Sequence, residues 1–263
     1  MLGKLMKHDG NAMNKSIVPY YGILVLMAVI ARVCGEVGKH FAVMKVINTF
    51  LVALVVIGMI GIMLFSGFTV IRRYYKNTLR DEGYLTNTLP IKRSNIVVSK
   101  VIWSLVYGIL GIFMIVLVFG IVFYSKDVMS VLKGMGTEMA AGFGVSLPVL
   151  AISAIIWAEL YFVAYILIIM AGMSIGQRFN DKKLVWSVVI SIVIYYVYQI
   201  VAVIVLGLSL FLRGNIMEEF SKSMPSTGLL QMIFLLMGGL TILLMIVCYL
   251  ISCQSVKYHL NLE

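Results

Sequence analysis

The chain has 263 residues, of which 62% are hydrophobic and only 12% are charged, and its formal net charge is +10. A soluble domain has roughly 45–50% apolar and about 25% charged residues, so the composition excludes a soluble protein and predicts an integral membrane protein. The basic residues flank apolar runs, which favours a role in orientation and in attraction to anionic membrane lipid over nucleic-acid binding.

Residues 1–15 precede the first apolar run and mix leucines and methionines with lysines. This spacing favours a short amphipathic helix lying in the membrane interface, and an unstructured positive flank is the alternative. The basic start is also typical of a signal peptide. Residues 31–34 lack a small-x-small cleavage site, so we expect the first span to be retained.

Six apolar runs follow, each near or above the roughly 17–25 residues that a helix needs to cross a bilayer. A transmembrane barrel is disfavoured, because its strands would be about ten residues long and would alternate in polarity. The sequence therefore predicts an all-α integral membrane protein with six transmembrane helices, forming a single domain over residues 1–263. The predicted spans are residues 16–33, 46–71, 97–124, 145–173, 184–212 and 229–253.

An even number of spans puts both termini on one side, and the Lys and Arg content of the short loops indicates which side that is. The side with the termini carries fourteen of the 21 basic residues, and the opposite side carries seven. We therefore expect both termini in the cytoplasm. Seven of the fourteen lie in residues 72–100, so the orientation depends mainly on this segment.

The loop between the second and third spans, residues 72–96, is the only long polar part of the chain. Pro90 lacks a backbone donor and cannot continue a helix, which favours a short helix before it and a turn. Ser94 offers an N-cap oxygen for a helix that runs into the third span. Lys100 then falls at the membrane edge, where we expect its ammonium to reach the lipid headgroups.

The short helix in this loop has an apolar side formed by Tyr84, Leu85 and Leu89. Such a side suits a groove on a partner protein. The alternative is an interfacial helix that only lies on lipid.

The loop contains the runs DEGYLT at residues 81–86, TLP at 88–90 and SK at 99–100, while the chain opens with MLGKL and closes with KYHLNLE. Together these features resemble bacterial type-2 ABC transporter permeases, the exporter-type membrane subunits found mainly in Gram-positive bacteria. The resemblance extends over the whole chain in topology and length, but only over these short runs by motif. The polar run at residues 8–11 departs from the N-terminal helix of that family.

In that family the loop forms a coupling helix that docks into a cleft of a separate ATPase subunit, and the N-terminal interfacial helix packs beside it. The resemblance implies two copies of that ATPase, which bind ATP and magnesium, a second permease, identical or homologous, and a place in the bacterial cytoplasmic membrane. It also implies the docking residues in this chain: Asp81, Glu82, Gly83, Tyr84, Leu85, Leu89, Pro90 and Arg93.

Glu159 is the only acidic residue well inside a predicted span. A charge there is costly, about 2.5–3.5 kcal/mol on insertion scales, and intramembrane acids often mark pathways. One hypothesis is a carboxylate that contacts cargo or senses protons, and the other is a neutral acid hydrogen-bonded to Tyr161 or Gln199. Tyr195 and Gln199 lie one turn apart in the fifth span and share a face, so they are further candidates for a pathway, with aromatic packing between helices as the alternative.

The sequence contains no G-x-x-x-x-G-K-[ST] motif for ATP, no H-E-x-x-H motif for zinc, and no aspartate inside a predicted span. We therefore expect neither catalysis nor a bound cofactor or metal in this chain. The leading interpretation is the permease subunit of an ABC exporter for a hydrophobic or amphipathic cargo such as a peptide, antibiotic or lipid. The alternatives are an ATP-independent carrier or channel that uses Glu159, and an antibiotic-sensing membrane subunit that does not transport.

Overall fold

The computed structural model describes residues 2–79, 94–179, 182–213 and 227–258. Within these ranges every regular element is a helix. In chain order they are α1 (Leu2–Val37), α2 (Ala42–Tyr74), η1 (Tyr75–Leu79), α4 (Ser94–Phe123), α5 (Lys126–Phe143), α6 (Leu147–Gly176), α7 (Lys183–Arg213) and α9 (Thr227–Tyr258).

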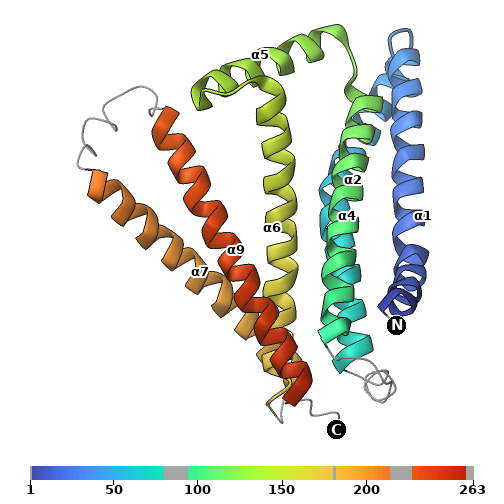
Figure 1. The fold of residues 1–263 in the computed structure, drawn as a ribbon. Helices are drawn as coiled ribbons and strands as arrows, with labels where there is room; N and C mark the ends of the chain where they lie inside the picture. Colours follow the sequence, from blue (N-terminus) through green and yellow to red (C-terminus); the bar gives the residue numbers. More distant parts are fainter. Residues whose placement is uncertain (1, 80–93, 180–181, 214–226, 259–263) are drawn as a thin grey trace.

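Six of these helices, α1, α2, α4, α6, α7 and α9, are long and apolar enough to cross a membrane, which confirms the predicted six-span, all-α fold. The first turns of α1 and the last turns of α9 lie at the same end of the bundle (Figure 1). We call this the terminal end and the opposite one the distal end. That the terminal end faces the cytoplasm remains a prediction from the Lys and Arg distribution.

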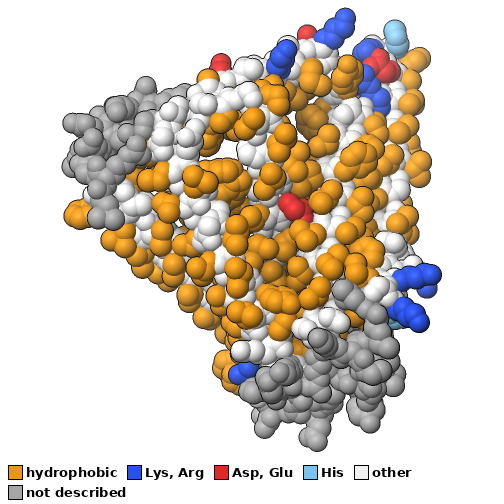
Figure 2. All heavy atoms as spheres, in the orientation of Figure 1, with side chains coloured by type: hydrophobic (Ala, Val, Ile, Leu, Met, Phe, Trp, Pro, Cys, Tyr) orange, Lys and Arg blue, Asp and Glu red, His pale blue; other side chains and the backbone are white. Residues whose placement is uncertain are grey.

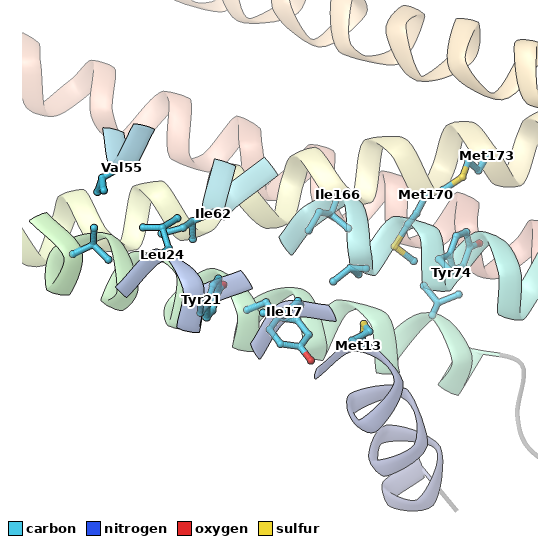
Figure 3. Packing of buried hydrophobic residues seen from close by; sticks show 14 of the residues in the cluster. Met13, Ile17, Tyr21, Leu24, Val55, Ile62, Tyr74, Ile166, Met170 and Met173 are labelled. Carbon is cyan, nitrogen blue, oxygen red and sulfur yellow. The ribbon is translucent and has the colours of Figure 1, made fainter. Parts of the chain in front are cut away.

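The spans form two groups of three: α1 packs with α2 and α4, while α6 packs with α7 and α9 (Figure 1). The two groups are joined towards the terminal end, where Ile166 and Met170 of α6 share a hydrophobic core with Tyr74 of α2 (Figure 3). The Tyr74 and Ser174 hydroxyl groups also share a hydrogen bond of 2.6 Å. This hydrogen bond and the shared core therefore join the two groups near the terminal end.

Small residues bring α6 and α7 together near the terminal end. A Cβ atom added at Gly172 would lie 2.7 Å from the backbone nitrogen of Ser191, and one added at Gly176 would lie 2.6 Å from that of Ser187. Such spacing lets helix backbones touch inside a membrane. The α6–α7 crossing therefore depends on both glycines.

The N-terminal segment continues directly into the first span, because α1 runs without interruption from Leu2 to Val37. Figure 3 shows its first turns bent away from the rest of the helix. Pro19 lies inside α1 and leaves an upstream carbonyl without its helical donor, which is a physical reason for a bend. Met13 and Ile17 are buried, so this part of α1 packs on protein; that residues 1–15 lie in the membrane interface remains a prediction.

The predicted loop at residues 72–96 is helical at both of its described ends. Helical structure extends past the second apolar run through η1 to Leu79 and resumes at Ser94. The polar residues at the end of the second span therefore belong to helical structure and not to a loop.

Helix α5 was not predicted from the sequence. Its N-cap, Ser125, accepts a hydrogen bond from the backbone N–H of Val128 at 3.2 Å, and its C-cap, Gly144, has φ 65°, a conformation suited to glycine. The helix lies across the distal ends of the spans (Figure 1). One side carries the exposed apolar residues Val128, Val131, Leu132, Met135 and Met139.

Candidate functional site

A buried cluster of polar side chains joins α1, the end of α2 and the start of α4. The Asp9 carboxylate is fully buried and accepts hydrogen bonds from Arg73 Nε at 3.1 Å, Asn77 Nδ2 at 3.2 Å and Ser99 Oγ at 2.8 Å. The Lys100 ammonium, which is also fully buried, donates to the same carboxylate. We call these five residues the Asp9 cluster.

The position of Lys100 corrects the sequence-based expectation. We expected its ammonium to reach lipid headgroups, but it has no exposed surface and forms an ion pair with Asp9. A buried charge is tolerated when it is paired and hydrogen-bonded. The Lys100 ammonium is therefore stabilised by Asp9 inside the protein and not by lipid headgroups at the membrane interface.

The first turns of α1 also touch α4 directly beside the cluster. Trp103 Nε1 donates a hydrogen bond to the Met6 carbonyl at 3.0 Å, and the Tyr107 hydroxyl donates to Asn14 Oδ1 at 2.8 Å. A Cβ atom added at Gly10 would lie 2.5 Å from Cη2 of Trp103. Gly10 therefore allows the indole ring to rest on the α1 backbone.

A five-residue π-helix, η1, ends the second span and carries Asn77 and Thr78, which are both buried. Segments of π-helix are rare and are frequently found at functional sites. Here Arg73, just before η1, and Asn77, inside it, reach the same carboxylate oxygen of Asp9. The π-helical segment is therefore part of the frame that leads into residues 80–93.

The docking residues predicted from the sequence lie outside the described residues, so the structure describes only what flanks them. They are Asp81, Glu82, Gly83, Tyr84, Leu85, Leu89, Pro90 and Arg93. The Asp9 cluster contributes Arg73 and Asn77 just before this segment and Ser99 and Lys100 just after it.

Glu159 lies midway along α6 and points towards α4. Its carboxylate Cδ lies 2.6 Å from where a Cβ atom would stand at Gly108. We call this contact between the two helices the α4–α6 seam. Figure 2 shows acidic colour in the middle of the largely apolar surface. Both carboxylate oxygens are buried, and neither has a hydrogen-bond partner among the described residues. The expected partners, Tyr161 and Gln199, therefore do not bond to it.

Gln199 instead donates a hydrogen bond to the Tyr195 hydroxyl at 3.1 Å, and both side chains are exposed on α7. Their predicted common face is thus confirmed. Tyr198 points to the other side, where it is buried and hydrogen-bonded to Thr241 of α9 at 2.8 Å. Because Glu159 faces α4 and the exposed pair lies on α7, the three predicted pathway residues do not form one cluster within this chain.

The Asp9 cluster was not predicted from the sequence. The available signal was the polar run at residues 8–11, where Asp9 is the only acidic residue before the first span. Its neighbour His8 also takes part, since its Nδ1 lies 3.0 Å from a terminal nitrogen of Arg73. Across the described ranges, no three His, Cys, Asp or Glu side chains gather in a way that would hold a metal ion.

The family model described as ABC-2 family transporter protein matches residues 39–174, which is more than half of the 263-residue chain. The matched range runs from the start of α2 almost to the end of α6. It includes both spans that flank residues 80–93, as well as Glu159. Comparisons with curated proteins and with solved structures gave no match.

Proposed function

The chain belongs to the ABC-2 transporter family, and on this premise we propose that it couples ATP hydrolysis in a separate subunit to export of a hydrophobic or amphipathic cargo. Family membership makes it the permease component of an ABC-type transporter, a multi-pass membrane protein that works with an ABC ATPase subunit. The proposed part is the direction of transport, the cargo class and the route of coupling.

The observation that supports this route is the frame around residues 80–93. The described residues on both sides of the segment are tied to one buried carboxylate, that of Asp9. Closely packed protein interiors have low compressibility and transmit strain. A push on the segment would therefore move the ends of α2 and α4 rather than bend a loose loop.

In the proposed mechanism, Tyr84, Leu85 and Leu89 are the apolar anchors of a short helix that occupies a groove of the ATPase. Pro90 ends that helix, and the charged residues Asp81, Glu82 and Arg93 contact the rim of the groove, with Gly83 between them. Two ATPase copies bind ATP and magnesium. Their closure tilts α2 and α4 and converts an inward-facing cavity into an outward-facing one.

The cavity in this proposal lies between two permeases, identical or homologous, and Glu159, Tyr195 and Gln199 contribute to it. Two features support their assignment. Glu159 has a buried carboxylate without a hydrogen-bond partner among the described residues, and the Tyr195–Gln199 pair is exposed on a mostly apolar helix. The mostly apolar span surfaces favour a peptide, antibiotic or lipid as cargo.

The alternative function, which the family assignment argues against, is an ATP-independent carrier in which Glu159 binds the coupling ion. The unpartnered carboxylate favours it as well, because intramembrane acids recur in ion pathways. The two candidates differ in one simple measurement. An ABC permease co-purifies with an ATPase from its native membrane, and a carrier does not.

The test of the coupling route is the double variant Tyr84→Ala, Leu85→Ala. We expect the variant chain to insert normally, but the amount of ATPase that co-purifies with it to fall at least tenfold. The reason is that truncating an interface anchor commonly lowers the binding free energy by more than about 1 kcal/mol. Leu105→Ala with Val106→Ala is the matched control, since this adjacent pair is exposed on α4. ATPase recovery at the wild-type level in the first variant would sink the proposal.

A further inference from the structure

We propose that Asp9 is a positioning residue that locks the first turns of α1 to the described helices on both sides of residues 80–93. Displacement of this segment then moves α1, α2 and α4 as one unit. The inference rests on the coupling function proposed above. It adds a residue that lies outside the predicted docking helix and outside the range that matches the family model.

The two carboxylate oxygens of Asp9 serve different helices. Oδ1 accepts from Arg73 and Asn77, which lie just before residues 80–93, at 3.1 and 3.2 Å. Oδ2 accepts from Ser99, at 2.8 Å, and from Lys100, which lie just after them. One side chain of α1 thus bridges the end of the second span and the start of the third.

This bridge needs a carboxylate. An ionised carboxylate accepts at both oxygens, with about four lone-pair sites in total, whereas an amide has one accepting oxygen and one donating NH2 group. In an Asp9→Asn chain, the NH2 group would face donors on one of the two helices. That variant therefore opens one half of the bridge while keeping the shape of the side chain.

Helix α1 carries the connection to the distal end, because it is held by its neighbours along its length. The Tyr20 hydroxyl donates to the Gly58 carbonyl of α2 at 2.8 Å, and the Tyr21 hydroxyl shares a hydrogen bond of 2.8 Å with Ser66. At the distal end Arg32 donates to the Tyr124 carbonyl at 3.1 Å. Movement at Asp9 is thereby passed to residues near the end of α1, where Cys34 lies.

Cys34 is a native reporter of this movement. It is partly exposed, whereas Cys248 is buried in α9, and peptide mapping by mass spectrometry separates Cys34 from the other cysteines. We would reconstitute the permease–ATPase complex in nanodiscs and measure the rate at which Cys34 reacts with a maleimide, without nucleotide and after trapping with ATP and vanadate. No cargo is required.

For the wild type we expect at least a threefold difference in rate between the two states. For Asp9→Asn we expect less than a 1.5-fold difference, with ATPase binding and basal hydrolysis retained. The control is Asp127→Asn, the same change at an exposed acid in the first turn of α5, which should behave as the wild type. If Asp9→Asn does not accumulate, Asp9→Asn with Lys100→Met removes both charges of the fully buried Asp9–Lys100 ion pair and should also lose the response.

A nucleotide response of wild-type size in either Asp9 variant would overturn the inference. So would a wild-type complex in which Cys34 reacts equally fast in both states, since α1 would then not move with the coupling segment. Failure of the proposed function gives a different result, because a wild-type chain that binds no ATPase shows it at the co-purification step.

Discussion

Two carboxylates contact α4, and their surroundings are opposite. Asp9 faces the start of the helix at Lys100 and accepts hydrogen bonds from four side chains. Glu159 faces Gly108, eight residues further along, or about 12 Å at 1.5 Å per residue. Among the described residues, neither of its buried oxygens has a hydrogen-bond partner.

This difference in hydrogen bonding distinguishes a carboxylate that stabilises the packing of its helices from one that has no hydrogen-bond partner among the described residues. Buried polar groups in native proteins are nearly always hydrogen-bonded, and an unsatisfied one calls for an explanation. Both carboxylate oxygens of Asp9 accept hydrogen bonds from side chains of this chain, so Asp9 stabilises the packing of α1 against α2 and α4. Glu159 lacks such partners among the described residues, so its carboxylate contributes no hydrogen bond to the contact between α4 and α6 there.

The largest effect is expected from Asp9→Ala. The change leaves the buried Lys100 ammonium and the mostly buried Arg73 guanidinium without this counter-charge. Removing one partner of a buried ion pair typically lowers the free energy of unfolding by about 3–5 kcal/mol. Thermal or denaturant unfolding in detergent measures the loss. Asp127→Ala, at an exposed acid of α5, should stay within about 1 kcal/mol of the wild type, and equal stabilities of the two variants would contradict the assignment.

A substitution of the second carboxylate should act in the opposite direction. Glu159→Leu removes an acid that has no hydrogen-bond partner among the described residues from an apolar seam. We therefore expect the free energy of unfolding to rise by about 1–3 kcal/mol, up to the scale of intramembrane charge costs. Glu138→Leu, at an exposed acid of α5, is the matched control and should change it little. A destabilised Glu159→Leu chain would mean that the carboxylate does have a stabilising partner, and the contrast with Asp9 would fail.

The six spans could be predicted from the sequence because a membrane helix must satisfy its own backbone and present apolar side chains to lipid. A run of apolar residues indicates which part of a helix lies in the membrane, but it does not indicate where the helix begins or ends. The second apolar run ends near residue 71, yet helical structure continues to Leu79. Helix α5 was missed for a related reason, since its polar side interrupts the apolar pattern that identifies a span.

The Asp9 cluster could not be predicted from a local sequence pattern. The partners of Asp9 lie at residues 73–100, and the cluster forms only when three helices pack together. Glu159 could be identified in advance as an isolated acid in an apolar run. Its contact with Gly108 could not, since any of several neighbouring helices would have been compatible with the sequence. Composition thus predicts which groups need partners, and tertiary packing decides which of them find one.

The smallest effect, and the sharpest test of the seam, comes from two glycines of α4. A Cβ atom at Gly108 would meet the Glu159 carboxylate, whereas one at Gly120 would have nothing within 4 Å. Gly120→Ala should stabilise the chain by about 0.5–1 kcal/mol through helix propensity. Gly108→Ala gains the same propensity but must displace a flexible carboxylate, so we expect a net change near zero.

The displaced carboxylate should also react faster with a carbodiimide, which mass spectrometry detects as modification of Glu159. In a Glu159→Ala background the collision is absent, so the two glycine substitutions should become equivalent in stability. If a difference persists there, the α4 backbone is limited by atoms other than the carboxylate. The seam would then be a packing contact of the kind that Gly172 makes with α7, and the Glu159 carboxylate would not determine how closely α4 and α6 approach.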